Sequence, residues 1–173
     1  IRLSLVGSEM CIRDSMKLYD NGKFGLTDRV SDYIPVLKGT GKERITIEEL
    51  LMHQSGLPAF WPFYKKAIDE ESYTGAFYRT RPDAGHHRQI DTRLFVIDHF
   101  GYKKELVSKV FSSDYPLLVS DSMYLHRSFR DSVLQQIAGV PLKDRRYRYS
   151  DLNFILLREI VENITCLLYT SPS

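Results

Sequence analysis

The sequence YRYSDLNFILLREIVENI, residues 147–164, predicts a short extended approach followed by a largely buried helix. Ser150 or Asp151 can cap that helix, because either side chain can accept hydrogen bonds from backbone N–H groups left free in the first turn. Tyr149 then lies at the entrance of the helix. On this pattern alone, we interpret the stretch as a core helix with a structural tyrosine at its start. The apolar side chains that recur at helical spacing are Leu152, Phe154, Ile155, Leu156, Leu157, Ile160, Val161 and Ile164.

The composition is that of a globular chain, and it excludes two classes of protein. A length of 173 residues corresponds to one domain, and 43% hydrophobic residues suffice for a core. A net charge of +2 is far from the strongly basic balance of a nucleic-acid binder. No apolar run approaches the roughly 20 residues that a membrane-spanning helix needs. We therefore expect no nucleic-acid partner and no membrane span, and no motif indicates a cofactor.

Both ends of the sequence look foreign to the rest. VGSEMCIRDS at residues 6–15 and CLLYTSPS at residues 166–173 resemble strings that arise when sequencing-adapter DNA is translated at the edges of assembled reads. We therefore expect foreign tails at residues 1–15 and 166–173, and a partial domain at residues 16–165. Both cysteines, Cys11 and Cys166, lie in these tails, so we expect no disulfide between them and infer no redox compartment.

The clearest local structure in the interior is a capped helix at residues 46–54. Thr46 and Glu49 form a capping box, in which each side chain satisfies a free backbone donor of the other residue. Gly56 and Pro58 then end the helix.

Helical spacing also dominates the rest of the interior. It predicts a helix over residues 121–138 and a helical face over residues 106–111, whereas strand-like alternation never lasts more than a few residues. We therefore predict that residues 16–165 are mostly helical, with main helices at 46–54, 121–138 and 151–164 and little sheet.

His53 and Ser55 suggest a nucleophile and its base, but the spacing does not favour that role. The two residues stand two positions apart at a helix end, so their side chains diverge, and no acid is placed to orient the imidazole. We interpret both as side chains hydrogen-bonded within the turn.

Residues that bind metals in other proteins occur between Ala59 and Gly101, but their spacing does not fit a metal site. They lack the i, i+4 histidine pairing of a helical zinc motif and provide no closed ligand set. We interpret the region as a solvated, loop-rich insertion. The residues concerned are His86, His87, Asp91, Asp98 and His99.

Two further clusters each have a plain and a functional interpretation. The aromatic segment FWPFY at residues 60–64 is either a loop packed on the core or a platform for stacking sugars. The basic run is either a solvated loop or a site for an anionic group; it consists of Lys143, Arg145, Arg146 and Arg148.

Three segments together resemble a known family. They are KLYDNGKFGLTD at residues 17–28, ITIEELLMHQSGLP at residues 45–58, and Tyr149-Ser150-Asp151 at the start of a helix. They resemble the serine beta-lactamase-related family, which includes class C beta-lactamases, D-alanyl-D-alanine carboxypeptidases and related esterases. The resemblance is greatest to the serine hydrolase domains that some bacteria fuse behind a family 3 glycoside hydrolase. It implies a mainly α fragment, the helical subdomain of the family's α+β fold, with most of the sheet missing.

The resemblance implies acyl transfer by the serine of a Ser-x-x-Lys motif. In the family, that lysine and a tyrosine share the proton transfer, and a Lys-Thr-Gly or His-Thr-Gly strand binds the substrate. Tyr149 matches the catalytic tyrosine. A phenol suits this task only if nearby positive charge lowers its pKa from about 10 toward working pH.

Asp151 stands where the family usually has a substrate-binding asparagine. An ionised carboxylate only accepts hydrogen bonds, so Asp151 would favour pairing with a lysine. Asn153 does not replace that asparagine, because two residues along a helix turn a side chain by about 200°.

The sequence contains neither of the family's other two catalytic motifs. No serine is followed by a lysine three positions later, and Lys38-Gly39-Thr40-Gly41 is not a Lys-Thr-Gly motif and precedes the tyrosine. We therefore expect an internal fragment of a serine hydrolase that is inactive alone. In the intact protein, the resemblance implies a beta-lactam, peptidoglycan-type peptide or ester substrate and suggests a periplasmic or cell-envelope location. The alternative is a non-catalytic helical binding module that uses residues 60–64 as its contact surface.

Overall fold

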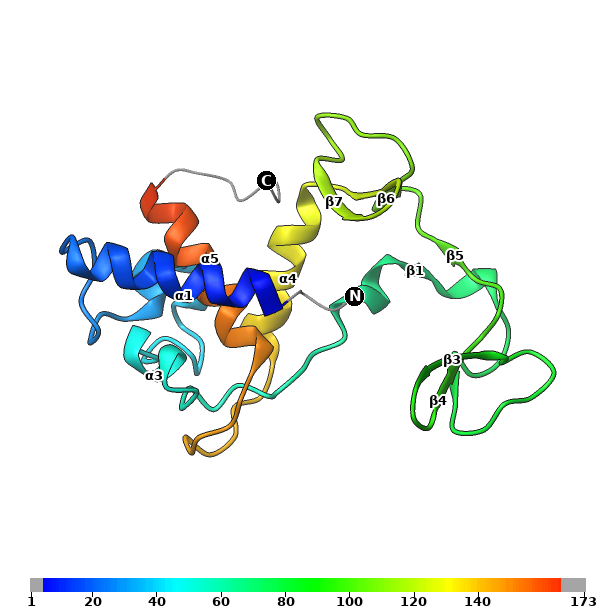
Figure 1. Cartoon of the computed structure of the whole chain (residues 1–173), viewed down its shortest axis with the longest axis horizontal. Helices are drawn as coiled ribbons and strands as arrows, with labels where there is room; N and C mark the ends of the chain where they lie inside the picture. The colour runs from blue at the N-terminus through cyan, green and yellow to red at the C-terminus, as the bar shows by residue number, and fades with distance from the viewer. Residues whose placement is uncertain (1–4, 166–173) are drawn as a thin grey trace. The chain divides into compact units, whose positions relative to one another are not determined.

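The computed structural model describes residues 5–165, which divide into two units. One unit is formed by the chain up to Pro62 and from Arg130 onward, and it is helical. The other is Phe63–Phe129, and it contains every strand of the described residues. Figure 1 labels most helices of the first unit and most strands of the second.

The helical unit is built from segments far apart in the sequence. Its helices are α1 (Leu5–Asp20), α2 (Val30–Tyr33), η1 (Pro35–Leu37), α3 (Ile47–Leu51), α4 (Ser128–Gly139), which begins at the boundary of the units, and α5 (Asp151–Thr165). Two 3-10 turns, η2 (Phe63–Ala67) and η3 (Glu70–Ser72), lie in the Phe63–Phe129 unit. The helix predicted at 151–164 is confirmed to within one residue. The one predicted at 46–54 forms over Ile47–Leu51, with Thr46 as its N-cap, and the predicted capping box with Glu49 is present.

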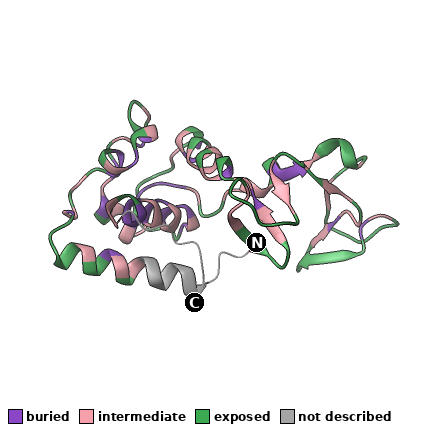
Figure 2. Cartoon of the chain, turned by 90° about the horizontal axis from the view of Figure 1, so that it is seen from above, coloured by how far each residue is buried: buried purple, intermediate pink, exposed green. Residues whose placement is uncertain are grey.

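α5 is the central helix of this unit. It packs against α1, α2 and α3. The prediction of a largely buried helix is confirmed by the burial of its apolar side chains. Each fully buried apolar side chain contributes roughly 1.5–3 kcal/mol to stability. The helical unit contains many of the buried residues coloured purple in Figure 2. The apolar residues of α5 that are at most 2% exposed are Leu152, Leu156, Leu157, Ile160 and Val161.

A buried carboxylate joins α5 to α4. Glu162 is 5% exposed, and its two oxygens lie 2.6 Å from Arg130 Nη2 and 2.8 Å from Arg158 Nε. Arg130 also contacts Glu159 at 2.8 Å. A buried carboxylate is tolerated only when it is paired in this way.

The Phe63–Phe129 unit contains three small antiparallel sheets, with strand orders β1-β5, β2-β4-β3 and β6-β8-β7. The strands are β1 (Ile68–Asp69), β2 (Tyr78–Arg79), β3 (Arg88–Asp91), β4 (Leu94–Val96), β5 (Gly101–Tyr102), β6 (Val107–Ser108), β7 (Leu117–Ser120) and β8 (Met123–Leu125).

The prediction of a mainly helical chain with little sheet is therefore wrong. The eight strands are each two to four residues long, which is too short for alternation along the sequence to be recognised. The helical face predicted at 106–111 includes strand β6. Within the described residues, the α-helices and the small sheets thus occupy different parts of the chain.

The helix predicted at 121–138 begins only at Ser128. Asp121 and Ser122 instead form the hairpin turn between β7 and β8, where Ser122 has a left-handed φ of 57°. Aspartate and serine are favoured both as helix caps and as turn residues, because their short side chains bond to nearby backbone groups. The same two residues therefore suit either structure.

α1 runs through the expected boundary between residues 15 and 16, and Ser15 is 1% exposed. The foreign origin of residues 1–15 stays a prediction. The expected tail at residues 166–173, with Cys166, lies outside the described residues. Over the described part of the chain, no helix combines the length and apolar character needed to span a bilayer.

Candidate functional site

Ser150 caps the first turn of α5. It is fully buried, its Oγ accepts a hydrogen bond from the Leu152 N–H at 3.2 Å, and its hydroxyl donates to the Pro58 carbonyl at 2.7 Å. The N–H of Asp151 donates to the Ala59 carbonyl at 3.0 Å. Of the two predicted caps, Ser150 is therefore the one used, and it also joins α5 to the segment that follows α3.

Residues 53–59 form hydrogen bonds with residues 143–151, the loop that leads into α5. The Lys143 N–H donates to the Gly56 carbonyl at 2.8 Å, and the Arg148 N–H donates to the His53 carbonyl at 2.9 Å. Gly56 has a left-handed φ of 77°, and a Cβ there would lie 2.6 Å from the Lys143 carbonyl oxygen. The close approach of the two segments thus needs a glycine at this position.

His53 follows the C-cap of α3, Met52, and has a backbone conformation that glycine usually adopts. Its φ is 53°, the His53 N–H donates to the Leu50 carbonyl at 3.2 Å, and the Gln54 N–H donates to the Glu49 carbonyl at 2.8 Å. This is the Schellman arrangement, in which a residue other than glycine costs roughly 1–2 kcal/mol. Such outliers cluster at functional sites.

The side chains of His53 and Ser55 both contact the side-chain amide of Asn153. The Ser55 hydroxyl donates to Asn153 Oδ1 at 2.7 Å, and Asn153 Nδ2 lies 3.0 Å from His53 Nδ1 and 3.1 Å from the Leu50 carbonyl oxygen. Ser55 also accepts from the Leu57 N–H at 3.2 Å. The predicted hydrogen bonding within the turn is confirmed for Ser55, whereas the ring of His53 bonds outside the turn, to Asn153 and to the Ser150 N–H. Their shared partner Asn153, which is fully buried, was not foreseen.

Tyr149 is accessible at the entrance of α5. It is 46% exposed, and its ring lies 4.8 Å from the His53 ring and 5.8 Å from the Phe154 ring between centroids. Burial, and then the charge and hydrogen bonding of Asp151, raise the pKa of the Tyr149 phenol above 10. In this chain the phenol is therefore protonated at neutral pH, and the shift is opposite to the one that a proton-accepting tyrosine needs.

The basic loop before Tyr149 is exposed, and one of its cations is paired. Arg145 Nη1 lies 2.6 Å from Glu49 Oε1 of α3. Lys143 and Arg148 contact residues 53–59 through their backbone N–H groups. The loop is therefore part of the same arrangement that fixes Tyr149.

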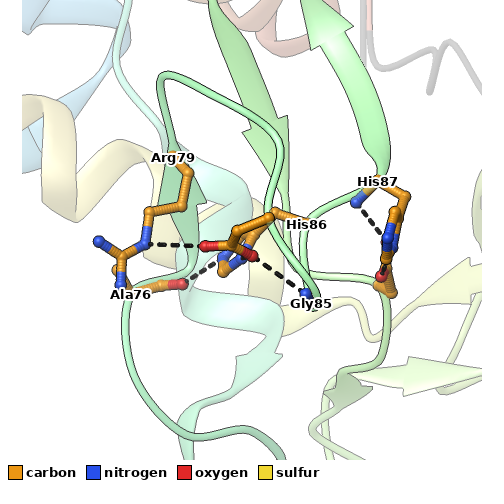
Figure 3. Close-up of polar contacts among 7 residues, drawn as sticks. Ala76, Arg79, Gly85, His86 and His87 are labelled. Atoms are coloured by element: carbon orange, nitrogen blue, oxygen red, sulfur yellow. Dashed lines mark hydrogen bonds and ion pairs between the residues drawn. The ribbon is translucent and has the colours of Figure 1, made fainter.

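His86 and His87, two histidines of the Phe63–Phe129 unit, each contact a different aspartate (Figure 3). His86, 6% exposed, lies between Asp83 Oδ1 and the Ala76 carbonyl, with each ring nitrogen 2.7 Å from its partner. His87 contacts Asp98 through its N–H at 2.9 Å and its Nδ1 at 2.6 Å.

An open cavity of about 550 Å³ is lined by His87, Asp98 and His99, together with Tyr73 and Thr74. Among the described residues, no three histidine, cysteine or acidic side chains are placed to hold a metal ion.

We predict that the loop around His86 is more stable at acidic than at alkaline pH. The Ala76 carbonyl and the Asp83 carboxylate raise the pKa of His86 above 6.5, because both ring nitrogens face acceptors. This contribution to stability is complete below pH 6.5 and is lost as the pH rises through the folded-state pKa.

Amide exchange of residues 76–86 between pH 6 and 9 measures the effect of His86 protonation. His86→Gln should remove the pH dependence and His87→Gln should not. Equal behaviour of the two variants would contradict the assignment.

The aromatic segment at residues 60–64 is divided between the two units, because the boundary falls between Pro62 and Phe63. Phe60 is 57% exposed, and the Tyr64 hydroxyl contacts that of Tyr78.

Comparison with known proteins gives one match. A family model described as Beta-lactamase matches residues 15–169. No curated protein and no solved structure matches the chain.

Proposed function

This chain belongs to the beta-lactamase family, and we propose that it is part of a serine hydrolase in which Tyr149 takes part in proton transfer during acyl transfer. The observation that carries the proposal is the placement of Tyr149. Its side chain is 46% exposed, whereas Ser150 beside it is fully buried and caps α5. A phenol on a half-exposed residue, in a turn held by the hydrogen bonds of Arg148 and Ser150 to His53, suits a catalytic role.

The raised pKa of Tyr149 is consistent with a site that lacks one of its charges. Asp151 contributes to that raised pKa, and the sequence holds no Ser-x-x-Lys motif to supply a compensating ammonium group. In a site completed by that motif, the lysine would favour the ionised phenol and could pair with the Asp151 carboxylate. We therefore propose that Asp151 contacts the lysine or the substrate.

We further propose that the complete enzyme acts on small acyl compounds, such as a beta-lactam, a D-alanine peptide of the peptidoglycan type or a simple ester. All three present a carbonyl that a serine can attack, so the motifs seen in this chain suit each of them. Because the sequence contains neither Ser-x-x-Lys nor Lys-Thr-Gly, we propose that the 173-residue chain is inactive alone.

The test compares this chain with an extended protein, in which the natural flanking sequence replaces residues 1–15 and 166–173. The extended protein should contain Ser-x-x-Lys shortly before residue 16 and should gain the mass of one acyl group when it is incubated with a beta-lactam or an activated ester. The 173-residue chain should gain none. An extended protein that is folded, lacks the motif and forms no adduct would contradict the proposal and favour the binding module.

A further inference from the structure

His53 contacts the turn around Tyr149 in three ways. Its backbone carbonyl accepts the Arg148 N–H at 2.9 Å, and its ring Nδ1 accepts the Ser150 N–H at 3.3 Å. Its ring lies against the Tyr149 ring, with 4.8 Å between centroids and 36° between planes. The residues on both sides of Tyr149, and the Tyr149 ring itself, are therefore in contact with one residue.

The hydrogen bonds determine which nitrogen of the His53 ring carries the proton. Asn153 Nδ2 donates to the Leu50 carbonyl at 3.1 Å, and because a carbonyl can only accept, this contact identifies the amide nitrogen. Nδ2 then also faces His53 Nδ1 at 3.0 Å, while Oδ1 accepts from the Ser55 hydroxyl at 2.7 Å. His53 Nδ1 therefore faces two donors, this amide and the Ser150 N–H. A nitrogen that faces two donors must be an acceptor, so His53 is neutral with its proton on Nε2.

We propose that neutral His53 is the positioning residue that fixes Tyr149 for proton transfer, and that protonation of His53 releases Tyr149. The inference rests on the role proposed above for Tyr149. An imidazolium carries N–H groups on both nitrogens, so Nδ1–H would face the Ser150 N–H and the Asn153 amide donor. Both hydrogen bonds would be lost, and the turn would be pre-organised only above the pKa of His53.

The groups around the ring determine the pH range of this change. Burial lowers the pKa of His53 below 6.5, and the carboxylate of Asp151 opposes that shift. Glu49 of α3 is paired with Arg145 at 2.6 Å, and the Tyr147 ring meets the His53 ring edge-on at 6.2 Å. Because the folded-state pKa is lowered, the stabilising contribution of the neutral ring is present above pH 6.5 and is lost as the pH falls through that pKa.

Two variants at position 53 separate the ring hydrogen bond from the backbone conformation. Since His53 has a φ of 53°, a replacement must tolerate the left-handed region, as asparagine and glycine do. His53→Asn keeps an acceptor oxygen near the place of Nδ1 and cannot titrate. His53→Gly removes the acceptor.

The measurement is amide hydrogen exchange on the 173-residue chain, with the ¹⁵N signals of the His53 ring followed in the same sample. We expect the protection factor of the Ser150 amide to fall about tenfold as His53 becomes protonated, the usual effect of one lost hydrogen bond. His53→Asn should keep the protection and abolish its pH dependence. His53→Gly should show low protection at every pH. The Arg148 amide, which donates to the backbone carbonyl of residue 53, should change less in each case.

Ser150 protection that stays constant while the ring titrates would overturn the proposal, and so would equal protection in the two variants. Because this readout needs no activity, its failure is distinct from a failure of the proposed function. In the extended protein, His53→Gly should lower kcat for ester hydrolysis with little change in KM. A fall in kcat with Tyr149→Phe but not with His53→Gly would support the proposed function and overturn the positioning role.

Discussion

Tyr149→Phe should lower ester hydrolysis by about 10²-fold or more in the protein extended by its natural flanks, the usual contribution of a positioned acid–base group. Phenylalanine retains the ring that packs against His53 and Phe154 and removes only the hydroxyl. The hydrogen bonds that fix the turn come from the backbone N–H groups of Arg148 and Ser150, so they survive the change. The initial rate of nitrophenyl acetate hydrolysis gives the ratio directly.

Tyr147→Phe is the matched control for this experiment. Tyr147 lies two residues earlier, is 71% exposed and also contacts the His53 ring, but nothing assigns its hydroxyl a role in the chemistry. Its loss should change the rate less than about twofold, as for most surface substitutions. If the extended protein is active and both variants match the parent, Tyr149 has a structural role only, and its hydroxyl takes no part in the reaction. This outcome has to be tested because Asp151 contributes to the raised pKa of Tyr149, and a raised pKa disfavours proton transfer by the phenol.

The features that the sequence predicted well are those determined by neighbouring residues. The helix that begins at Asp151 follows from its apolar spacing, and the capping box of Thr46 and Glu49 is confined to four residues. Both are encoded in the spacing of residues along one helix, so the order of residues along the chain contains the necessary information. The family resemblance, which the match over residues 15–169 confirms, rests on the same segments.

The contacts that build the site join residues about 100 positions apart. Asn153 bonds to His53 across 100 residues and to Ser55 across 98, and spacing within one segment cannot predict such a pair. One feature of the sequence does indicate that Asn153 has distant partners. Asn153 falls in register with Leu157, Ile160 and Val161 on the buried face of α5, and an amide on such a face needs polar partners from elsewhere.

The strands of the Phe63–Phe129 unit were missed for a different reason. With only two to four residues each, they lack room for a pattern of period two to repeat. Cross-strand contacts, such as those pairing Tyr78 with Val96, define these sheets, and those contacts are again distant in sequence.

Gly56→Ala should lower the free energy of unfolding of the helical unit by about 3 kcal/mol. The φ of 77° alone disfavours any side chain, and the new Cβ would lie 2.6 Å from the Lys143 carbonyl oxygen. That oxygen belongs to the backbone, and the Lys143 N–H donates to the Gly56 carbonyl at 2.8 Å. Relief of the clash therefore requires this hydrogen bond to lengthen or break. Urea denaturation followed by the fluorescence of Trp61, the one tryptophan of the chain, measures the change.

Gly39→Ala separates the two causes of that loss. Gly39 has a similar φ of 70°, but a Cβ there would have no atom within 4 Å. Gly39→Ala should therefore lower the free energy of unfolding only by the cost of a left-handed backbone conformation, roughly 1 kcal/mol. The difference between the variants is then the energy of the close approach between Gly56 and Lys143. Equal losses would mean that the 143–150 loop relaxes freely away from residue 56, which contradicts a turn held rigidly enough to place Tyr149. A larger loss at Gly56 instead shows that the His53–Ala59 segment and this loop behave as one rigid unit.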